Sequence, residues 1–337
     1  MSTRGGLLTG LLASGLLGAA LVAPVPAQAE RLRVASTGNV DPVLNGEHVW
    51  VDAFMRQARA AGFELRFHPG GSLGKEEERT ELVNLDLLQV NMAGLSELQV
   101  YSRTARALSI PFMVTDYTQF DRLLDETDLV ATINAELAHT NLLLVDAALL
   151  GGMSGLFNTR TPVAQPADLG ELRIRAMSRS DMIVLESWGA RGVQVAWEEV
   201  AQALETGIAH GYLNPPLVPL MFGHAGRIRH FSDLRLTPSA RWAVVSRRWY
   251  EGLDETRRAA IEAALAGARE ANRAWAREVQ AREREALEAA GIAFRALSDE
   301  ELAAFAGPVH QRYRETLLPE EYARLRRWLD SLVERGP

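Results

Sequence analysis

Residues 142–152, with the sequence Leu-Leu-Leu-Val-Asp-Ala-Ala-Leu-Leu-Gly-Gly, divide the chain into two halves of similar organisation. The apolar run 142–150 is typical of a strand in a sheet that is covered on both faces. Two consecutive glycines interrupt the run and predict a crossover between domains. A length of about 300 residues after the N-terminal leader also exceeds what one hydrophobic core usually holds. Two domains are therefore predicted.

Strands and helices alternate on both sides of this crossover. Before it, residues 31–35 and 63–67 alternate as strands, and apolar residues between Trp50 and Ala61 recur at helical spacing. After it, the predicted elements are a strand at 172–176, a helix at 180–188, a strand at 193–195 and a helix at 198–206. Strand, helix and strand in succession form the unit of an α/β sheet, whose ligands bind outside the carboxyl ends of the strands. Two such lobes predict a ligand cleft between them.

Residues 254–290 are rich in Ala, Glu and Arg, contain no proline and are followed by Gly291. This composition predicts one helix of about 35 residues, or about 50 Å, which is longer than one lobe needs. We therefore expect it to span both lobes. The predicted fold is an α/β fold of two lobes, each a mixed sheet flanked by helices. The first lobe is expected to contain residues 30–151 and about 240–279, and the second residues 152–239 and about 280–337.

The N-terminus has the pattern of a secretory signal peptide. Arg4 precedes the almost purely apolar stretch 7–22, and Ala27-Gln28-Ala29 forms a small-x-small cleavage site. Cleavage after Ala29 removes residues 1–29 and leaves a mature chain that starts at Glu30. The alternative, a retained membrane anchor, would require the cleavage site to be fortuitous. The sequence thus predicts a secreted protein.

The composition excludes several classes of site. The chain has no cysteine, which rules out thiol catalysis, thiolate zinc sites and iron–sulfur clusters. A net charge of −7 provides no overall attraction to nucleic acids, so no nucleic-acid partner is expected. Its seven histidines form no His-x-x-x-His pair, and no phosphate-binding glycine loop is present. We therefore predict no metal and no cofactor, and an anionic ligand must be attracted by local charges.

Several segments, taken in order, resemble the solute-binding proteins of tripartite ATP-independent periplasmic (TRAP) transporters. The resemblance covers essentially the whole mature chain and is carried by these segments: 67–74 followed by Glu76, Glu77 and Glu78, 108–112, 161–163, 166–169, 172–175, 188–190, 199–207 and 211–215. It implies two lobes that close around a small organic acid. It also implies delivery to a permease with a small and a large membrane subunit. We expect the receptor itself to be a monomer.

Arg175 is the leading candidate for binding a ligand. In the predicted strand 172–176, Arg173 and Arg175 lie on the face opposite the apolar residues, and Arg175 is nearer the carboxyl end. A guanidinium group matches a carboxylate with two parallel hydrogen bonds. The resemblance assigns the same role to this position, because it matches the arginine that holds the ligand in the family.

Four further residues are candidates, each with a structural alternative. The resemblance places Asn214 and Trp197 at the ligand, although Asn214 could instead form the turn before Pro215 and Trp197 could belong to the core. Asn39 follows the first strand and Asn91 ends the predicted strand 87–92, where each would open onto the crevice between the lobes. Either asparagine could equally be a turn or capping residue.

The family commonly carries a second arginine just after the crossover, but residues 152–158 contain none. Arg160 is a candidate replacement from a shifted position; otherwise the ligand needs only one arginine. This departure argues against a dicarboxylate ligand.

Two alternative functions compete with this interpretation. A secreted α/β hydrolase is poorly supported, because residues 152–155 lack the Gly-x-Ser-x-Gly pattern of a nucleophile elbow, and no enzymatic activity is predicted. A binding protein that serves a sensor kinase or another type of transporter would have the same fold and pocket, so the sequence leaves that alternative open.

Overall fold

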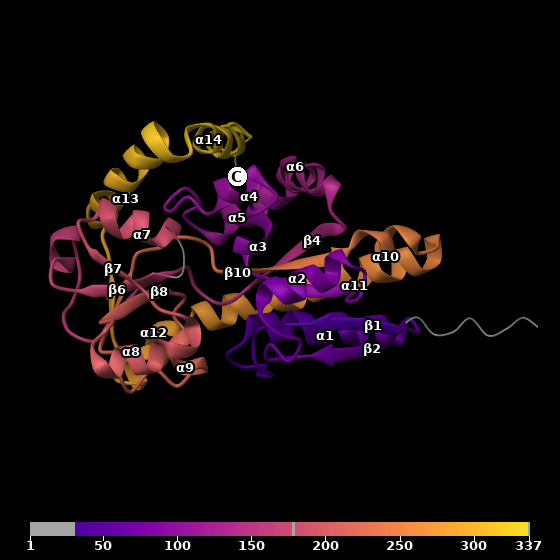
Figure 1. Cartoon of the computed structure of the whole chain (residues 1–337), viewed down its shortest axis with the longest axis horizontal. Helices are drawn as coiled ribbons and strands as arrows, with labels where there is room; N and C mark the ends of the chain where they lie inside the picture. The colour runs from indigo at the N-terminus through magenta and orange to yellow at the C-terminus, as the bar shows by residue number, and fades with distance from the viewer. Residues whose placement is uncertain (1–30, 177–178, 336–337) are drawn as a thin grey trace, which may run out of the picture.

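The computed structural model describes residues 31–176 and 179–335, so the predicted signal peptide lies outside the described residues. Two separate sheets form two lobes that lie side by side (Figure 1). Each sheet contains both parallel and antiparallel strand pairs, which confirms the predicted two-lobed α/β fold with mixed sheets. Within these residues, no helix has the length and apolar character that a membrane crossing requires.

The first lobe contains a five-stranded sheet with the order β2-β1-β3-β10-β4, in which β10 runs antiparallel to both neighbours. Its strands are β1 (Arg31–Ala35), β2 (Glu64–His68), β3 (Val90–Ala93), β4 (Leu142–Leu149) and β10 (Ala240–Ser246). Its helices are α1 (Gly46–Ala60), α2 (Glu76–Asn84), α3 (Leu95–Gln99), α4 (Arg103–Leu108), α5 (Tyr117–Asp125), α6 (Leu129–Glu136), the 3-10 helix η1 (Leu137–His139), α10 (Arg247–Gly252) and α11 (Glu255–Gln280).

The second lobe contains a six-stranded sheet with the order β11-β9-β5-β8-β6-β7. Its strands are β5 (Gly155–Asn158), β6 (Arg173–Ala176), β7 (Arg191–Gln194), β8 (Gly211–Asn214), β9 (His230–Asp233) and β11 (Ala293–Ala296). The remaining helical segments are η2 (Pro166–Leu169), α7 (Arg179–Ser187), η3 (Trp197–Glu199), α8 (Val200–Thr206), α9 (Val218–Met221), α12 (Glu283–Ala289), α13 (Asp299–Arg312), the π turn η4 (Tyr313–Leu317) and α14 (Pro319–Glu334).

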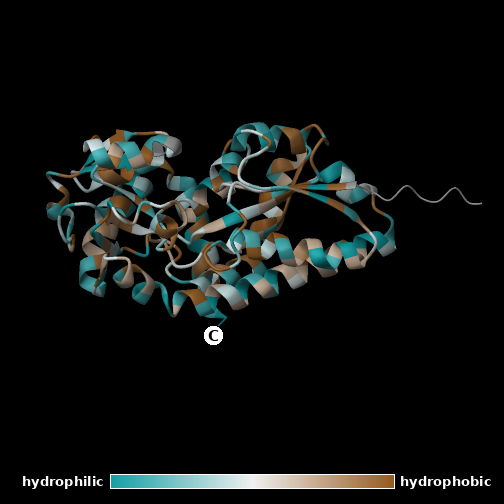
Figure 2. Ribbon diagram, turned by 90° about the horizontal axis from the view of Figure 1, so that it is seen from below, coloured by the Kyte–Doolittle hydropathy of each residue, from teal (hydrophilic) through white to brown (hydrophobic). Residues whose placement is uncertain are grey.

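Local sequence explains how the first lobe begins. In β1, Leu32 and Val34 point to one side and are fully buried in a cluster with Trp50 and Phe54 of α1. The side chain of Asn45 caps α1 by accepting a hydrogen bond from the backbone NH of Glu47. Hydrophilic and hydrophobic residues occupy different sides of the helices in Figure 2. In α1, the amphipathic spacing seen in the sequence places the apolar side of the helix against the sheet.

The expected single helix over residues 254–290 is instead two helices, α11 and α12, separated at Ala281 and Arg282. Arg282 has φ −119° and ψ −5°, away from regular helical values. α11 packs along α1 and β4 of the first lobe, whereas α12 packs on β11 of the second. The helical segment therefore passes from one lobe to the other, but it is interrupted where it leaves the first lobe. A high helix propensity over the whole stretch does not reveal this break.

The C-terminal helices also connect the lobes. α13 packs on α7 of the second lobe, whereas α14 packs on α4 and α5 of the first. Arg103 holds the start of α14 through a 2.8 Å ion pair with Glu321, and Arg324 pairs with Glu136 of α6 at 2.9 Å. This differs from the expectation that residues 280–337 all belong to the second lobe. The amphipathic pattern of α14 indicates that it packs on a neighbour, but not on which one.

Two segments of chain cross between the lobes next to each other. Backbone hydrogen bonds join Leu150 to Ser239 at 2.9 Å and Ser154 to Thr237 at 3.0 Å. Gly151 adopts a φ of +112°, which favours glycine. Beside it, the buried carboxylate of Glu283 accepts a hydrogen bond from the backbone NH of Gly152. A side chain from the start of α12 thus binds the crossover.

Burial raises the pKa of Glu283 from its usual 4.5 to about 7. Between these two values the folded protein holds a proton that the unfolded chain releases. The free energy of unfolding should therefore fall by about 3 kcal/mol as the pH rises through this window. Glu283→Gln should remove this part of the pH dependence in urea unfolding at pH 5 and pH 7.5, whereas Glu285→Gln, at an exposed position of the same helix, should retain it. An unchanged pH dependence in Glu283→Gln would contradict the prediction.

Candidate functional site

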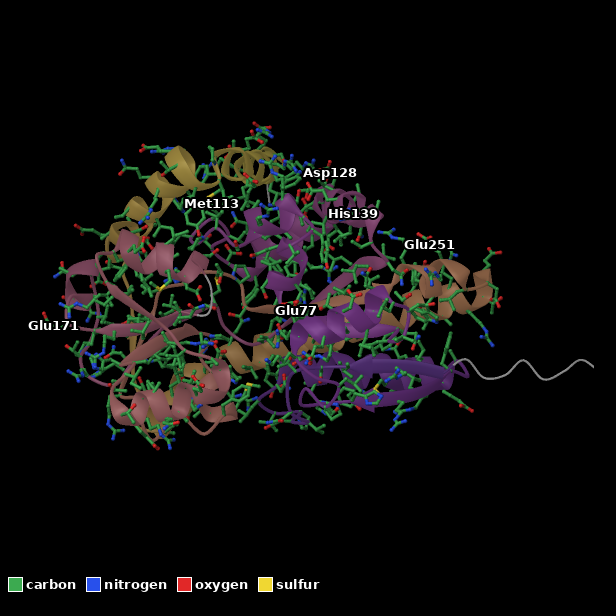
Figure 3. The ribbon with its side chains drawn as sticks, viewed as in Figure 1. Glu77, Met113, Asp128, His139, Glu171 and Glu251 are labelled. Atoms are coloured by element: carbon green, nitrogen blue, oxygen red, sulfur yellow. The ribbon has the colours of Figure 1, made fainter. Side chains whose placement is uncertain are left out.

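The strand pairing places one edge of each sheet beside the crossover. In the first lobe, Ala240 pairs with Leu149, which ends β4 just before the crossover, and Arg241 pairs with Ala148. In the second lobe, Gly155 pairs with Asn214, so the carboxyl end of β8 also lies beside the crossover. Figure 3 labels Glu171, just before β6, on the outer side of the second lobe, so β6 runs toward the first lobe. These two facing edges are the candidate site.

Arg175 lies on β6 with only 5% of its surface exposed. Its Nε donates a 2.9 Å hydrogen bond to the backbone oxygen of Val195. Its guanidinium carbon lies 5.5 Å from the centroid of the Trp197 ring, within the range of a cation–π interaction. A backbone bond on one side and an aromatic ring on the other fix the orientation of this guanidinium group.

Trp197 begins η3 and is partly buried. Phe222 meets its ring edge-on at a centroid distance of 4.9 Å, and His224 lies 5.3 Å away. The hydroxyl of Tyr212 lies 3.4 Å from Nδ1 of the His224 ring. Burial lowers the pKa of His224 and raises that of Tyr212. Trp197 therefore belongs to a packed aromatic cluster on one side while Arg175 stacks against it.

Asn214 ends β8, the strand next to β6. Arg175 pairs with Tyr212, and residues two apart on a strand point to the same side, so Arg175 and Asn214 share one face of the sheet. Nδ2 of Asn214 is buried and has no hydrogen-bond partner among residues 31–176 and 179–335. A buried amide donor normally has an acceptor, so this group can receive one from a ligand. The structure brings Arg175, Trp197 and Asn214 to the same part of the second lobe.

The two asparagines of the first lobe occupy different environments. Asn39 is exposed in the loop after β1, and its backbone oxygen accepts a 2.7 Å hydrogen bond from the side chain of Asn45. Asn91 is fully buried in β3, where its Oδ1 accepts a 3.3 Å hydrogen bond from Nε of Arg79. The side chain of Asn91 thus supports Arg79 from within the lobe.

Arg160 lies far from this group along the strands. It is exposed just after β5, and the neighbouring Asn158 pairs with Gly211 at the start of β8, whereas Asn214 ends that strand. Arg160 therefore lies toward the edge of the second sheet that faces away from the crossover. The structure does not bring it together with Arg175.

The facing edge of the first lobe carries a charged network that the sequence did not indicate. Nη1 of Arg241 lies 2.5 Å from Oε1 of Glu76, which also accepts a 2.8 Å hydrogen bond from the hydroxyl of Thr37. Arg79 donates to Thr37 and, at 2.6 Å, to the backbone oxygen of Gly74. Glu47 of α1 lies 3.9 Å from Nε of Arg241. Only the acidic start of α2 could be seen in the sequence, because Arg241 comes from a distant strand.

Within this network, electrostatics favour the charged forms of Glu76 and Arg241. Burial raises the pKa of Glu76, but Arg241 and the Thr37 hydroxyl outweigh it and hold that pKa below the usual value. For Arg241, burial opposes the charge, yet Glu76 and Glu47 raise its pKa. Burial, followed by the charge of Glu76, raises the pKa of Glu97 nearby. An additional negative charge is therefore disfavoured at this edge.

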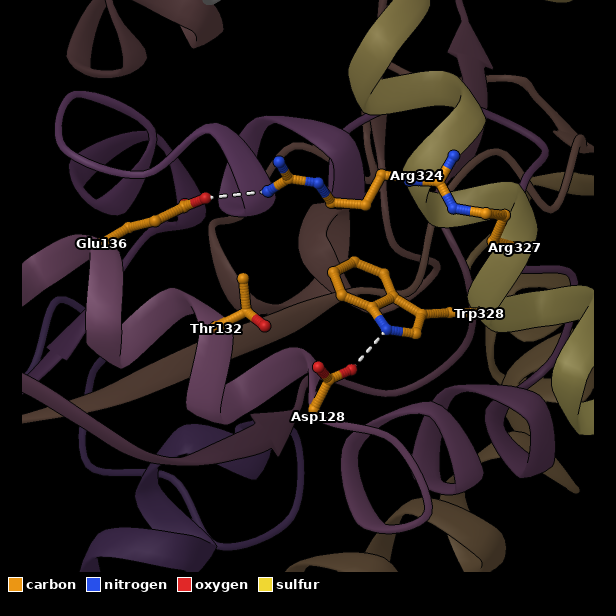
Figure 4. Close-up of a pocket in the computed structure, with 6 residues that line it drawn as sticks. All are labelled: Asp128, Thr132, Glu136, Arg324, Arg327 and Trp328. Carbon is orange, nitrogen blue, oxygen red and sulfur yellow. Dashed lines mark hydrogen bonds and ion pairs between the residues drawn. The ribbon is translucent and has the colours of Figure 1, made fainter.

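Elsewhere, a pocket of about 470 Å³ lies between α6 and α14 on the outer side of the first lobe (Figure 4). Glu136 pairs with Arg324 at one side of it, and the Trp328 indole donates a 2.6 Å hydrogen bond to Asp128 at the other. These contacts attach the C-terminal helix to the first lobe. Within the described ranges, no three His, Asp or Glu side chains gather as they would around a metal ion.

Known proteins resemble this chain in both sequence and structure. The C4-dicarboxylate-binding periplasmic protein DctP of Rhodobacter capsulatus is 24% identical over 275 residues, which cover 77% of this chain and 79% of that protein. A TRAP periplasmic solute-binding protein from Ochrobactrum anthropi superposes with a TM-score of 0.81 at 19% identity, over 92% of this chain and 97% of the other.

A second solved structure is a TRAP periplasmic solute-binding protein from Roseobacter denitrificans with bound L-galactonate. It superposes with a TM-score of 0.78 at 20% identity, over 89% of this chain and 99% of the other. These superpositions confirm the two-lobed fold. The family model for bacterial extracellular solute-binding proteins, family 7 (DctP), matches residues 39–318. Because that match covers most of the chain, this protein belongs to family 7 of the bacterial extracellular solute-binding proteins.

Proposed function

We propose that this protein captures a small organic acid between its lobes, with the ligand carboxylate bound to Arg175, and delivers it to the membrane subunits of a TRAP permease. The observation that carries the proposal is the buried guanidinium group held between Val195 and Trp197 at the edge that faces the first lobe. A guanidinium fixed in this way can bind a carboxylate without first giving up side-chain freedom. Asn214 supplies a donor beside it.

The cellular setting follows from the sequence and the family. The N-terminal signal pattern directs the chain to the periplasm, and cleavage after Ala29 releases the mature receptor. The receptor acts as a monomer, without cofactor and without chemistry of its own. Its membrane partners are the small and the large subunit of the permease. A sensor kinase or another transporter in place of the permease would leave the binding site unchanged.

The charged side chains around the candidate site support a ligand with one carboxylate. Residues 152–158 lack the second arginine that the family commonly carries, and Arg160 lies toward the opposite edge of the second sheet. Across from Arg175, the partly exposed Arg241 is already paired with Glu76. Known relatives include a C4-dicarboxylate-binding protein and one with bound L-galactonate, a hydroxy monocarboxylate. A hydroxy or 2-oxo monocarboxylate suits this chain better than a dicarboxylate.

A ligand screen tests the proposed function. The mature chain from Glu30, shown to be folded and free of carried-over ligand, should be stabilised by a hydroxy or 2-oxo monocarboxylate or a sugar acid. Binding at one hundred times Kd adds about 2.7 kcal/mol to the free energy of unfolding, which thermal-shift measurements detect. Amino acids and dicarboxylates serve as comparison classes. If no carboxylate raises the melting temperature, the proposed function is ruled out.

Substitution of Arg175 tests the assigned residue. Arg175→Ala should weaken carboxylate binding by about 3 kcal/mol, or about 100-fold in Kd, because the buried carboxylate loses its charged partner. Arg175→Lys should recover only part of this affinity, since an ammonium group cannot form two parallel hydrogen bonds. Isothermal titration calorimetry measures both variants against Arg160→Ala, which should bind like the wild type. Wild-type affinity in Arg175→Ala would refute the assignment.

A further inference from the structure

The first lobe presents a guanidinium group at the candidate site, but this group is already paired. Arg241 keeps 17% of its side chain exposed, and its Nη1 lies 2.5 Å from Oε1 of Glu76, whose side chain is 26% exposed. Arg79, in contrast, is 1% exposed, and its three nitrogens donate to Asn91, Gly74 and Thr37. Arg241 is thus the guanidinium of this network that a ligand can still reach.

The position of Arg241 makes it relevant to the ligand. Its strand neighbour Ala240 pairs with Leu149 at the crossover, which places Arg241 on the edge facing the second lobe. Figure 3 shows Glu77, next to Glu76 at the start of α2, on the side of the first lobe that faces the second. Arg175 approaches from that second lobe on β6. The Glu76–Arg241 pair and Arg175 therefore bound the site from opposite sides.

Packing fixes the pair in this arrangement. The hydroxyl of Thr37 donates to the same oxygen of Glu76 that contacts Arg241. A Cβ atom at Gly94 would lie 2.7 Å from Oε2 of Glu76 and 3.2 Å from Nη1 of Arg241, so the pair fits only because residue 94 has no side chain. Glu76 therefore cannot move away without losing its hydroxyl donor and its charged partner.

We propose that Glu76 is a specificity-determining residue that occupies Arg241 and so keeps it from binding a second ligand carboxylate. This inference rests on the proposed function, in which Arg175 binds the first carboxylate. A second carboxylate near Arg241 would also meet the negative charge of Glu76, and Coulomb repulsion at such a distance is substantial in a partly buried site. A ligand hydroxyl, in contrast, can donate to Glu76 and accept from Arg241.

The proposal predicts a change of selectivity when the charge of Glu76 is removed. Glu76→Gln keeps the size of the side chain but releases the guanidinium of Arg241. The probes are matched acids that differ only at one terminus: D-gluconate with D-glucarate and L-threonate with L-tartrate. For at least one pair, the wild type should bind the monocarboxylate more tightly. In Glu76→Gln the ratio of the two dissociation constants should move toward the dicarboxylate by about tenfold or more.

Two further variants complete the test by calorimetry. Glu77→Gln removes an exposed carboxylate from the same helical turn and should retain the wild-type ratio. The double variant Glu76→Gln/Arg241→Gln, which leaves neither charge without its partner, should not show the tenfold shift, because no guanidinium is released. A shift of that size toward the dicarboxylate in the double variant would contradict the role of Arg241, so the proposal stays testable if Glu76→Gln alone fails to fold. An unchanged ratio in folded Glu76→Gln, or a wild-type preference for the dicarboxylates, would overturn the inference while leaving a carboxylate receptor in place. If the wild type binds none of the four acids, both the inference about Glu76 and the proposed monocarboxylate class are overturned.

Discussion

The buried side-chain amide of Asn272 joins the three elements on which the geometry of the first lobe depends. Its Oδ1 accepts from the backbone NH of Leu149, and its Nδ2 donates to the backbone oxygens of Leu149 and Gly46. One side chain of α11 thereby binds the end of β4 and the start of α1. Because each of these groups is buried, the loss of one partner would leave the others unsatisfied. The crossover leaves the first lobe from this fixed point.

The two edges that face each other across the crossover are built differently. In the second lobe, Arg175 is oriented by one backbone oxygen and by the ring of Trp197, whose far side rests on Phe222 and His224. This arrangement orients the guanidinium group of Arg175 against an aromatic ring. In the first lobe, Arg241 is neutralised by carboxylates that are themselves buried or hydrogen-bonded. A ligand with one charged end and one hydroxylated end matches this asymmetry.

The connections between the lobes combine a backbone ladder with individual side chains. The two crossing segments are hydrogen-bonded to each other, Glu283 holds the NH of Gly152, and α14 reaches back from the second lobe to ion pairs on the first. The ladder and the buried Glu283 lie at the crossover, whereas α14 is held by ion pairs of Arg103 with the buried Glu321 and of Arg324 with Glu136.

The sequence by itself determined the two α/β lobes, because hydrophobic periodicity and the Gly151–Gly152 break are local signals. It also indicated Arg175, since strand alternation and the matching family segment both point to that residue. The interruption of the long helix at Arg282, the placement of α14 and the partner of Glu76 were decided only by the tertiary structure. The reason is the same for all three. Each depends on contacts between residues far apart in the chain, and a local pattern shows that a side chain needs a partner without showing which strand or lobe supplies it.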